Sequence, residues 1–302
     1  MSRNKRVVTI YLAGGVGNQL FQYFAGKYVA MKNSCELLVD TSRIGIGGSN
    51  HGSEIFHFTI PEQKAYSKFR NVIYRSWVWR AHHFMLRKNR GYGLLVKSIF
   101  QSFYSRELDY DLELEDLKAP ISLTGYFQTR AYYVLLKNAG MPKLALKNPS
   151  TWYFSTSKLI LENRSLAIHI RRGDYVELKD SFGLLSKSYY MNAVKEIEMH
   201  FSFTQVLIFT DDIHSAREMN LDFGLTPVHF IEPPSESEAV ESLMLMSAAQ
   251  GIVLSNSTFA WWSAVIGETK HVIAPAQWFK TLEGPKNLLE DNWIRLKSEW
   301  ES

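Results

Sequence analysis

The sequence predicts an α/β fold with two halves, each built around a parallel β-sheet. Short runs rich in Val, Ile and Leu recur along the chain and are typical of strands buried on both faces. Stretches with helical periodicity lie between them, and this alternation is typical of β/α units that form parallel sheets. The 302 residues, 46% of them apolar, suffice for two domains with cores of ordinary size.

The first half opens with a strand, a glycine-containing turn, a helix and a second strand. Residues 7–12 are rich in β-branched side chains and predict a buried strand. The turn covers residues 14–19, the helical pattern residues 20–28, and the second strand residues 36–40. A further strand is expected at residues 121–127. This order indicates a βαβ unit with its glycine turn at the first crossover.

The second half repeats the alternation more regularly. The sequence predicts strands at residues 166–170, 205–210, 251–254 and 271–274, and helices at residues 188–201, 236–249 and 260–266. Prolines and a Ser/Thr cluster mark residues 142–157 as a linker. We therefore expect an N-terminal domain of residues 1–150 and a C-terminal domain of residues 151–302.

Polar clusters follow three of the strands predicted in the second half. They are His169–Asp174, Asp211–Asp212 and Ser255–Thr258. Because ligands of open α/β sheets bind outside the carboxyl ends of the strands, we expect the clusters to converge on one crevice. Arginines and hydroxyls suit phosphates, and carboxylates suit ribose hydroxyls or base N–H groups. The three clusters therefore predict a nucleoside diphosphate site.

Two adjacent arginines, Arg171 and Arg172, are the most informative part of these clusters. Each guanidinium offers a planar fork of donors that matches two phosphate oxygens, and Asp174 could hold one of the forks in place. The helix after Ser257 and Thr258 adds backbone N–H donors and a favourable dipole. The alternative interpretation is a structural Arg–Asp pair beside a turn.

Three other motifs suggest different ligands. Gly15-x-Gly17 with Asp40 imitates a dinucleotide-binding fingerprint, but Leu20 stands in place of the third glycine. Asp109-Tyr110-Asp111 matches the Asp-x-Asp metal pattern, although an acidic run such as residues 109–116 is more typical of a solvated face. The dinucleotide and Asp-x-Asp metal interpretations are therefore the weaker ones.

A magnesium ion at Asp211 and Asp212 is the third alternative, since Mg²⁺ combines one or two carboxylates with phosphate oxygens. Two arginines already supply positive charge there, so we expect no metal. The histidines have no zinc spacing. Trp261 and Trp262 are expected to fill the core rather than stack on sugar.

The net charge of +4 hides one strongly basic segment, residues 63–106. It holds ten Lys and Arg and no Asp or Glu, and its aromatic side chains lie among the basic ones. Its apolar residues Phe69, Val72, Ile73 and Trp77 have helical spacing. Such a helix can lie on an anionic membrane. It could equally bind an acidic saccharide, or pack on the core with a solvated basic face. Nucleic acid is not expected, because no nucleic-acid motif accompanies the charge.

The sequence contains few indications of the cellular compartment of the protein. Cys35 is the only cysteine, so no intrachain disulfide forms, which fits a reducing compartment. No apolar run is long enough for a transmembrane helix, and no signal-peptide pattern follows the basic first residues. We therefore expect a cytoplasmic protein, and one interpretation of residues 63–106 adds peripheral contact with the inner face of the cell membrane.

Three sequence blocks together resemble the bacterial α1,2-fucosyltransferase family. They are Gly14–Tyr23, reading GGVGNQLFQY, His169–Tyr175, reading HIRRGDY, and Ser255–Trp262, reading SNSTFAWW. The shorter blocks Gly125–Gln128 and Phe209–Asp212 match as well. The blocks follow the family's order and span nearly the whole chain.

The resemblance implies a GT-B type α/β fold, with two Rossmann-like domains and a cleft between them. It implies GDP-β-L-fucose as the donor, bound by the C-terminal domain, and no metal or other cofactor. It also implies inverting transfer of fucose to the 2-hydroxyl of a galactose residue, with the acceptor on the side of the N-terminal domain. The product would belong to a surface polysaccharide, an O-antigen or a lipid-linked glycan. The alternatives are a transferase of the same fold with another nucleotide-sugar donor, or a non-catalytic saccharide-binding protein.

The resemblance also assigns roles to residues of the blocks. Arg171 holds the β-phosphate of the leaving GDP, Asp174 and Arg172 shape that site, and His169 lies in its wall. Asp211 or Asp212 contacts guanine or ribose. The remaining donor-binding residues are Gly15, Gly17, Ser255, Asn256, Ser257, Thr258 and Phe259. The catalytic residues expected are Arg171, Asp174 and Asn18, the last lying across the cleft near the acceptor, although a turn cap is an equal alternative for Asn18.

Overall fold

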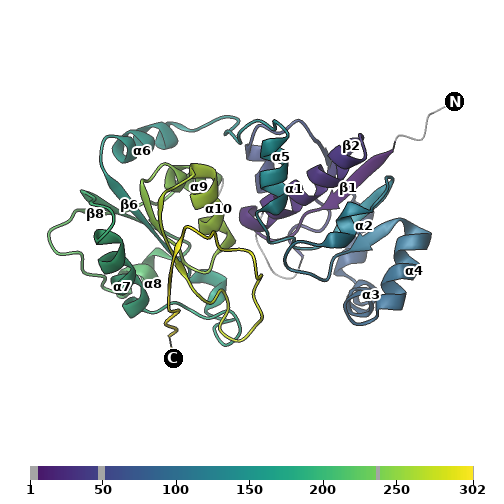
Figure 1. Ribbon diagram of the computed structural model, residues 1–302. Coiled ribbons are helices and arrows are strands. Elements are labelled where there is room, and N and C mark those ends of the chain that lie inside the picture. Colours follow the sequence, from purple (N-terminus) through teal and green to yellow (C-terminus); the bar gives the residue numbers. More distant parts are fainter. Residues whose placement is uncertain (1–5, 47–51, 236–238, 302) are drawn as a thin grey trace. The chain divides into compact units, whose positions relative to one another are not determined.

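The structure is a computed structural model and describes residues 6–46, 52–235 and 239–301 (Figure 1). The chain divides into two compact units. The N-terminal unit comprises residues 1–144 and 285–288, and the C-terminal unit comprises residues 145–284 and 289–302. The chain thus leaves the first unit at Leu144, inside the stretch marked as a linker by its sequence. The return of residues 285–288 to the first unit has no sequence signal.

The N-terminal unit contains a five-stranded parallel sheet with the strand order β3-β2-β1-β5-β4. Its strands are β1 (Val7–Tyr11), β2 (Glu36–Asp40), β3 (Gln63–Ala65), β4 (Ser102–Tyr104) and β5 (Ile121–Thr124). The edge strands β3 and β4 have three residues each, too few for a periodicity to show. Strand β5 ends before the predicted Phe127, whose φ of 52° is left-handed rather than extended.

Helix α1 (Val16–Lys32) is buried on most of its surface and packs against the sheet. The close approach depends on Gly26, because a Cβ atom there would lie 2.8 Å from Cβ of Ile10. The other helical segments of this unit are η1 (Glu54–His57), α2 (Lys68–Arg75), α3 (Trp77–Lys88), α4 (Arg90–Phe100), η2 (Leu112–Glu115) and α5 (Ala131–Asn138).

The basic segment folds into the three short helices α2, α3 and α4. Each begins at a polar side chain that accepts a hydrogen bond from a backbone N–H of the first turn. Ser67 accepts from the N–H of Arg70, Ser76 from that of Trp79 and Asn89 from that of Tyr92. These caps explain why the segment forms three helices instead of one. Across the described residues, no helix has the length and apolar character needed to cross a membrane.

The C-terminal unit contains a six-stranded parallel sheet with the strand order β11-β10-β9-β6-β7-β8. Its strands are β6 (Ser165–Ile170), β7 (Gln205–Thr210), β8 (Val228–Phe230), β9 (Gly251–Val253), β10 (His271–Pro275) and β11 (Ile294–Leu296). Strand β6 lies between β7 and β9, so the three polar clusters follow adjacent parallel strands. This arrangement confirms that they lie at one edge of the sheet.

The helical segments of this unit are α6 (Thr151–Leu161), η3 (Gly173–Tyr175), α7 (Lys187–Glu198), α8 (Ile213–Glu218), α9 (Ala239–Ser247) and α10 (Thr258–Gly267). Helix α6 occupies part of the predicted linker, because Ser150 caps it by accepting from the N–H of Tyr153. The first residues predicted for the helix at 236–249, namely 236–238, lie outside the described residues. Trp261 and Trp262 are fully buried, as expected for core residues.

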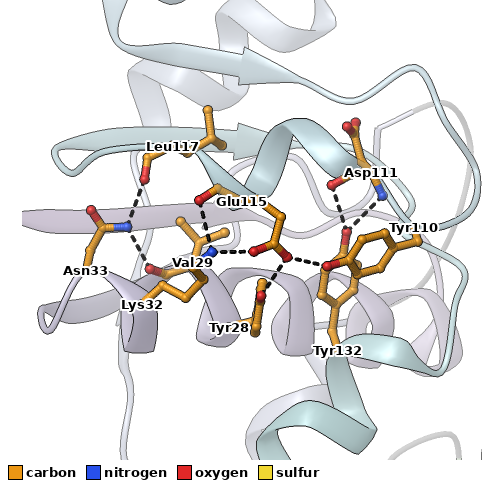
Figure 2. Close-up of polar contacts among 9 residues, drawn as sticks. All are labelled: Tyr28, Val29, Lys32, Asn33, Tyr110, Asp111, Glu115, Leu117 and Tyr132. Carbon is orange, nitrogen blue, oxygen red and sulfur yellow. Dashed lines mark hydrogen bonds and ion pairs between the residues drawn. The ribbon is translucent and has the colours of Figure 1, made fainter.

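One polar network joins α1 to the segment around η2 (Figure 2). The Glu115 carboxylate accepts hydrogen bonds from the hydroxyls of Tyr28, at 2.6 Å, and Tyr110, and pairs with Lys32. Lys32 also donates to the carbonyl oxygen of Glu115 at 3.0 Å. The contacts with Lys32, Tyr110 and Tyr28 lower the pKa of Glu115 from 4.5 to about 2.

Glu115→Gln is expected to lower the free energy of unfolding by about 1–2 kcal/mol at pH 7, since charge-assisted hydrogen bonds are lost at a partly exposed site. The pKa of Glu115 is lower in the folded state than in the unfolded chain, so its stabilisation is full above pH 4.5 and is lost as the pH falls toward 2. Urea denaturation at neutral and acidic pH measures both effects. Glu113→Gln, at an exposed carboxylate that pairs with Lys97, is the control and should change little. An equal loss in both variants would contradict the role of the network.

Candidate functional site

Arg171 is the first residue after strand β6, and its guanidinium lies among acidic and aromatic groups. One Nη atom is 3.0 Å from Oδ2 of Asp211, and the other pairs with Asp174. The centre of the guanidinium lies 5.0 Å from the middle of the Tyr175 ring, a cation–π distance. Its side chain keeps 19% of its surface exposed, whereas the Asp174 side chain is 59% exposed. The charge of Arg171 is thus held firmly and still faces solvent on one side.

Arg171 stays fully charged at this position. Burial disfavours its charge, but the carboxylates of Asp211 and Asp174 outweigh burial and raise the pKa of Arg171. Its Nε atom is buried and has no hydrogen-bond partner among the described residues. A buried N–H group without an acceptor is costly in a folded protein. Arg171 therefore has unused capacity to donate to an anion.

Asp211, directly after strand β7, fixes the loop that carries Arg171. Its Oδ1 atom accepts a hydrogen bond from the backbone N–H of Arg172 at 2.8 Å, while Oδ2 pairs with Arg171. Gly173 makes this approach possible, because a Cβ atom there would lie 2.4 Å from Oδ2 of Asp211. Both carboxylate oxygens of Asp211 thus interact with groups of this protein, Oδ1 with the backbone of Arg172 and Oδ2 with the side chain of Arg171.

Arg172 differs from Arg171 in its exposure and in its pairing partner. Its side chain is only 5% exposed, and its two Nη atoms pair with the two carboxylate oxygens of Glu301 at 2.7 Å each. The sequence predicts that both guanidiniums serve the donor site. In the structure, the Arg172 guanidinium pairs with the carboxylate of Glu301. The Nε atom of Arg172, like that of Arg171, is buried without a partner among the described residues. Arg171 keeps more of its side chain exposed and is therefore the better candidate for direct phosphate contact.

His169, the next-to-last residue of β6, is buried and uncharged. Its Nδ1 atom lies 2.7 Å from Oγ of Ser255, and its ring lies beside that of Phe259, with centroids 5.4 Å apart. Burial, with a smaller effect of the nearby Arg171 charge, lowers the pKa of His169 to about 3. A neutral ring in a wall, rather than a proton carrier, is what this geometry supports.

The segment after strand β9 joins the same region. Asn256 donates to the carbonyl oxygens of Phe182, at 3.0 Å, and Gly183, and accepts from the hydroxyl of Tyr175 through its own carbonyl. Ser255 and Ser257 are buried, whereas Thr258 and Phe259, in the first turn of α10, are partly exposed. The ring of Tyr175 thus connects Arg171 to this segment.

Asp212 caps the start of helix α8. Its carboxylate accepts from the N–H of Ser215 at 3.1 Å and from the Ser215 hydroxyl at 2.7 Å. These hydrogen bonds lower the pKa of Asp212. Of the two adjacent aspartates, Asp211 is therefore the one in contact with Arg171.

The glycine turn of the N-terminal unit is held by buried amides. Gly14 has a left-handed φ of 74°, and Gly15 is the N-cap of α1. The side chain of Gln19 donates to the carbonyl oxygens of Gly14, at 2.8 Å, and Gly52. Gly17 is buried in the first turn of α1. The turn predicted from the sequence is therefore present and is rigidly anchored.

Asn18, on the same helix, has one amide neighbour from the loop after β5. Its Oδ1 atom accepts a hydrogen bond from Nε2 of Gln128 at 3.1 Å. Oε1 of Gln128 is buried and has no partner among the described residues. With its oxygen occupied, Asn18 keeps its amide N–H groups as donors, and the capping alternative finds no support because α1 is capped by Gly15.

The carboxylates of the other motifs are engaged within the N-terminal unit. Asp40 pairs with Arg70 at 2.7 Å and accepts from the N–H of Ser42, which leaves no free carboxylate for a ribose. Asp109 accepts from the backbone and side chain of Asn287. Asp111 is buried and accepts from Ser105 at 2.6 Å. Neither the dinucleotide nor the Asp-x-Asp metal interpretation gains support from this geometry.

Four residues around the predicted site escaped the sequence reasoning. Gly173 and Tyr175 lie next to Arg171 in the chain, so the motif itself could have pointed to them. Gln128 closes a block that the resemblance includes, but its contact with Asn18 has no sequence signal. Glu301 is separated from Arg172 by 129 positions, and no pattern links the two.

Comparison with known proteins finds glycosyltransferases that are similar to this chain. The model of glycosyl transferase family 11 matches residues 153–297, which include the segments around Arg171, Asp211 and Ser255. An alpha-1,2-colitosyltransferase of Escherichia coli is 26% identical over 299 residues, covering 96% of this chain and 99% of its own. The O-antigen biosynthesis glycosyltransferase WbnK of Escherichia coli is 28% identical over 311 residues, covering 94% of this chain and 99% of its own.

Solved structures show the same fold at low sequence identity. The fucosyltransferase NodZ from Bradyrhizobium matches with a TM-score of 0.51 at 14% identity, covering 89% of this chain and 95% of its own. A family 9 glycosyl transferase from Veillonella parvula matches with a TM-score of 0.54 at 7% identity, covering 100% of this chain and 90% of its own. Together with the two parallel-sheet units, these likenesses confirm a GT-B type fold. The chain is thus similar to glycosyl transferase family 11 over residues 153–297 and to two glycosyltransferases over nearly its whole length.

Proposed function

We propose that this enzyme transfers fucose from GDP-β-L-fucose to the 2-hydroxyl of a galactose residue, with inversion at the anomeric carbon. The acceptor galactose belongs to an O-antigen, a surface polysaccharide or a lipid-linked glycan, and the reaction takes place in the cytoplasm. The observation that carries the proposal is the environment of Arg171, a charged guanidinium with an unpaired buried N–H at the carboxyl edge of a parallel sheet. The match to the family 11 model and the O-antigen role in the name of one relative support the biological setting.

The chemistry of donor cleavage fits Arg171. Breaking the bond between fucose and the β-phosphate moves negative charge onto the phosphate oxygens. A guanidinium fixed beforehand by Asp211 and Asp174 stabilises this charge more in the transition state than in the ground state. The phosphate takes the open side of Arg171, where the side chain is exposed. His169 and the segment Ser255–Phe259 form the wall of this donor site in the proposal.

The acceptor hydroxyl attacks the anomeric carbon on the face opposite the leaving GDP, which inverts the β-linked donor to an α-linked product. The hydroxyl loses its proton in this step. With a loose, oxocarbenium-like transition state, strong base assistance is not needed, and we assign Asn18 the task of orienting an acceptor or donor oxygen. Its amide N–H groups are suited to this, because Gln128 occupies its oxygen. Gly15 and Gly17 shape the turn that carries Asn18.

We also propose that the transfer needs no metal ion. Asp211 is saturated by Arg171 and by the N–H of Arg172, and Asp212 is occupied at the start of α8. Neither aspartate therefore offers the free carboxylate that a Mg²⁺ ion would bind beside phosphate. The positive charge at the diphosphate comes from Arg171 instead.

A second donor has a specific observation in its favour. One relative that covers nearly the whole chain is an alpha-1,2-colitosyltransferase. Transfer of colitose to a 2-hydroxyl would use the same leaving-group chemistry at Arg171 and the same linkage. The two candidates differ only in the sugar that the donor site accepts.

The test is an assay of the purified full chain with GDP-fucose and galactose-terminated oligosaccharides, in the presence of EDTA. We expect GDP release that depends on the acceptor, and a product with fucose α-linked to the 2-hydroxyl of galactose by NMR. Turnover with nucleotide-linked colitose but not with GDP-fucose would replace the proposal by the second candidate. GDP release from neither donor would indicate a saccharide-binding protein, and activity restored by Mg²⁺ or Mn²⁺ would contradict the metal-free mechanism.

A further inference from the structure

Helices α2, α3 and α4 of the N-terminal unit expose an unusual amount of apolar surface. Consecutive helices contact one another, α2 with α3 and α3 with α4. The side chain of Trp77 is 78% exposed, that of Phe69 75% and that of Phe100 69%. The exposed large apolar residues of these helices, which we call the apolar helical face, are Phe69, Val72, Ile73, Trp77, Val78, Phe84, Met85, Leu94, Leu95, Ile99 and Phe100.

Core packing does not account for this face. The buried apolar residues of the three helices are Tyr74, Leu86 and Val96, one in each helix. One interpretation of the segment is a set of core-facing helices with a solvated basic side. It thus accounts for only a small part of the apolar residues, because most of them are exposed. Large exposed apolar patches on soluble domains mark binding surfaces. The remaining residues therefore need a partner outside the N-terminal unit.

The charge of the segment restricts what that partner is. Residues 63–106 hold ten basic and no acidic residues. Arg70 pairs with Asp40 and Lys97 with Glu113. In the part of the chain that the structure describes, no carboxylate pairs with the exposed Arg80, Arg87, Lys88 or Arg90. Unpaired cations among exposed apolar groups favour a partner that is both apolar and anionic.

The order of residues in α3 fits such a partner well. Trp77, Arg80, Phe84 and Arg87 follow at intervals of three or four residues, so aromatic rings and guanidiniums alternate along one side of the helix. Long cationic side chains keep their charge at a polar layer while their stems lie on apolar surface, and Trp is enriched at the same boundary. This boundary is the interface between lipid headgroups and acyl chains.

We propose that α2, α3 and α4 bind the surface of an anionic lipid bilayer, with the apolar helical face in the interface and the arginines at the lipid phosphates. Binding is peripheral, since none of the described helices is suited to span a membrane. A second copy of the chain is a poor occupant, because a two-fold interface would set the basic surface against itself. The inference is independent of the proposed donor and acceptor.

The test is co-sedimentation of the full chain with vesicles of phosphatidylcholine alone or mixed with phosphatidylglycerol. We expect binding to the mixed vesicles to be stronger by about tenfold or more, and to weaken with added salt. The double variant Trp77→Ser, Phe84→Ser should lose most of this binding, and Arg80→Gln, Arg87→Gln should lose the preference for anionic lipid. The matched control is Phe154→Ser, Leu161→Ser on α6, which removes equally exposed apolar side chains from the other unit and should bind as the wild type does.

Trp77→Phe provides a readout that depends on the face itself. Adding anionic vesicles should shift the tryptophan fluorescence of the wild type to shorter wavelength, and Trp77→Phe should lose most of the shift while still binding. Vesicle binding unchanged in both double variants of α3 would overturn the proposal. So would an absence of vesicle binding together with a dimer that Trp77→Ser, Phe84→Ser dissociates, because the occupant would then be a second copy.

Discussion

Arg171→Ala is expected to lower kcat for transfer from GDP-fucose by about 10²–10³-fold, the typical cost of losing one donor that stabilises developing negative charge. The reason is that Arg171 combines a full positive charge, held by Asp211 and Asp174, with a buried N–H that has no partner within the described chain. The KM for GDP-fucose should change much less than kcat, since the interaction strengthens mainly in the transition state. Steady-state kinetics of the purified variant give both values.

The control for this substitution is Arg217→Ala. Arg217 is exposed and pairs with Glu232 at 3.4 Å, so its removal changes the net charge equally without touching the site. Its activity should equal that of the wild type. Arg171→Lys should fall between wild type and alanine, because an ammonium keeps the charge but loses the planar fork. A rise in KM with kcat unchanged in Arg171→Ala would assign Arg171 to ground-state binding only and contradict the proposed role.

Gly173→Ala is expected to lower kcat/KM by about 10–100-fold without unfolding the protein. A Cβ atom at this position would lie 2.4 Å from Oδ2 of Asp211, the oxygen that pairs with Arg171. The carboxylate is the end of a flexible side chain, so it moves away and releases the guanidinium. A misplacement of about 1 Å at reacting groups can cost a factor near 10² in rate.

A double-mutant cycle tests whether Gly173 acts through Asp211. In an Asp211→Ala background there is no carboxylate to displace, so adding Gly173→Ala should cause little further loss of activity. Additive losses of the two substitutions would show that the alanine acts elsewhere. Circular dichroism of each variant verifies that the fold is retained.

Much of the fold could be predicted because each central strand reads as an uninterrupted apolar run. Strands β2 and β7 have the predicted bounds, and β1, β6, β9 and β10 differ from them by one residue. The edge strands β3, β4, β8 and β11 escaped prediction, since three residues carry too little periodicity. Helix α6 and the division of the basic segment depend on caps at Ser150, Ser67, Ser76 and Asn89, whose effect a periodicity search does not register.

The position of the candidate site followed from the parallel sheet, because adjacent parallel strands bring their carboxyl ends together. Which partner each of two like residues finds did not follow. Arg171 and Arg172 are neighbours in the chain, yet Glu301 binds one and Asp211 and Asp174 hold the other. The same holds for Asp211 and Asp212, one at Arg171 and one at the start of α8. Such choices depend on long-range contacts that no local pattern encodes.

A crystal structure of the enzyme with GDP is the most direct measurement of the central claim. The account predicts the β-phosphate within hydrogen-bond distance of the Arg171 guanidinium, with Arg172 still paired to Glu301. Nucleotide bound away from the carboxyl edge of strands β6, β7 and β9, or a phosphate contacted by Arg172 while Arg171 stays engaged only with Asp211 and Asp174, would contradict it.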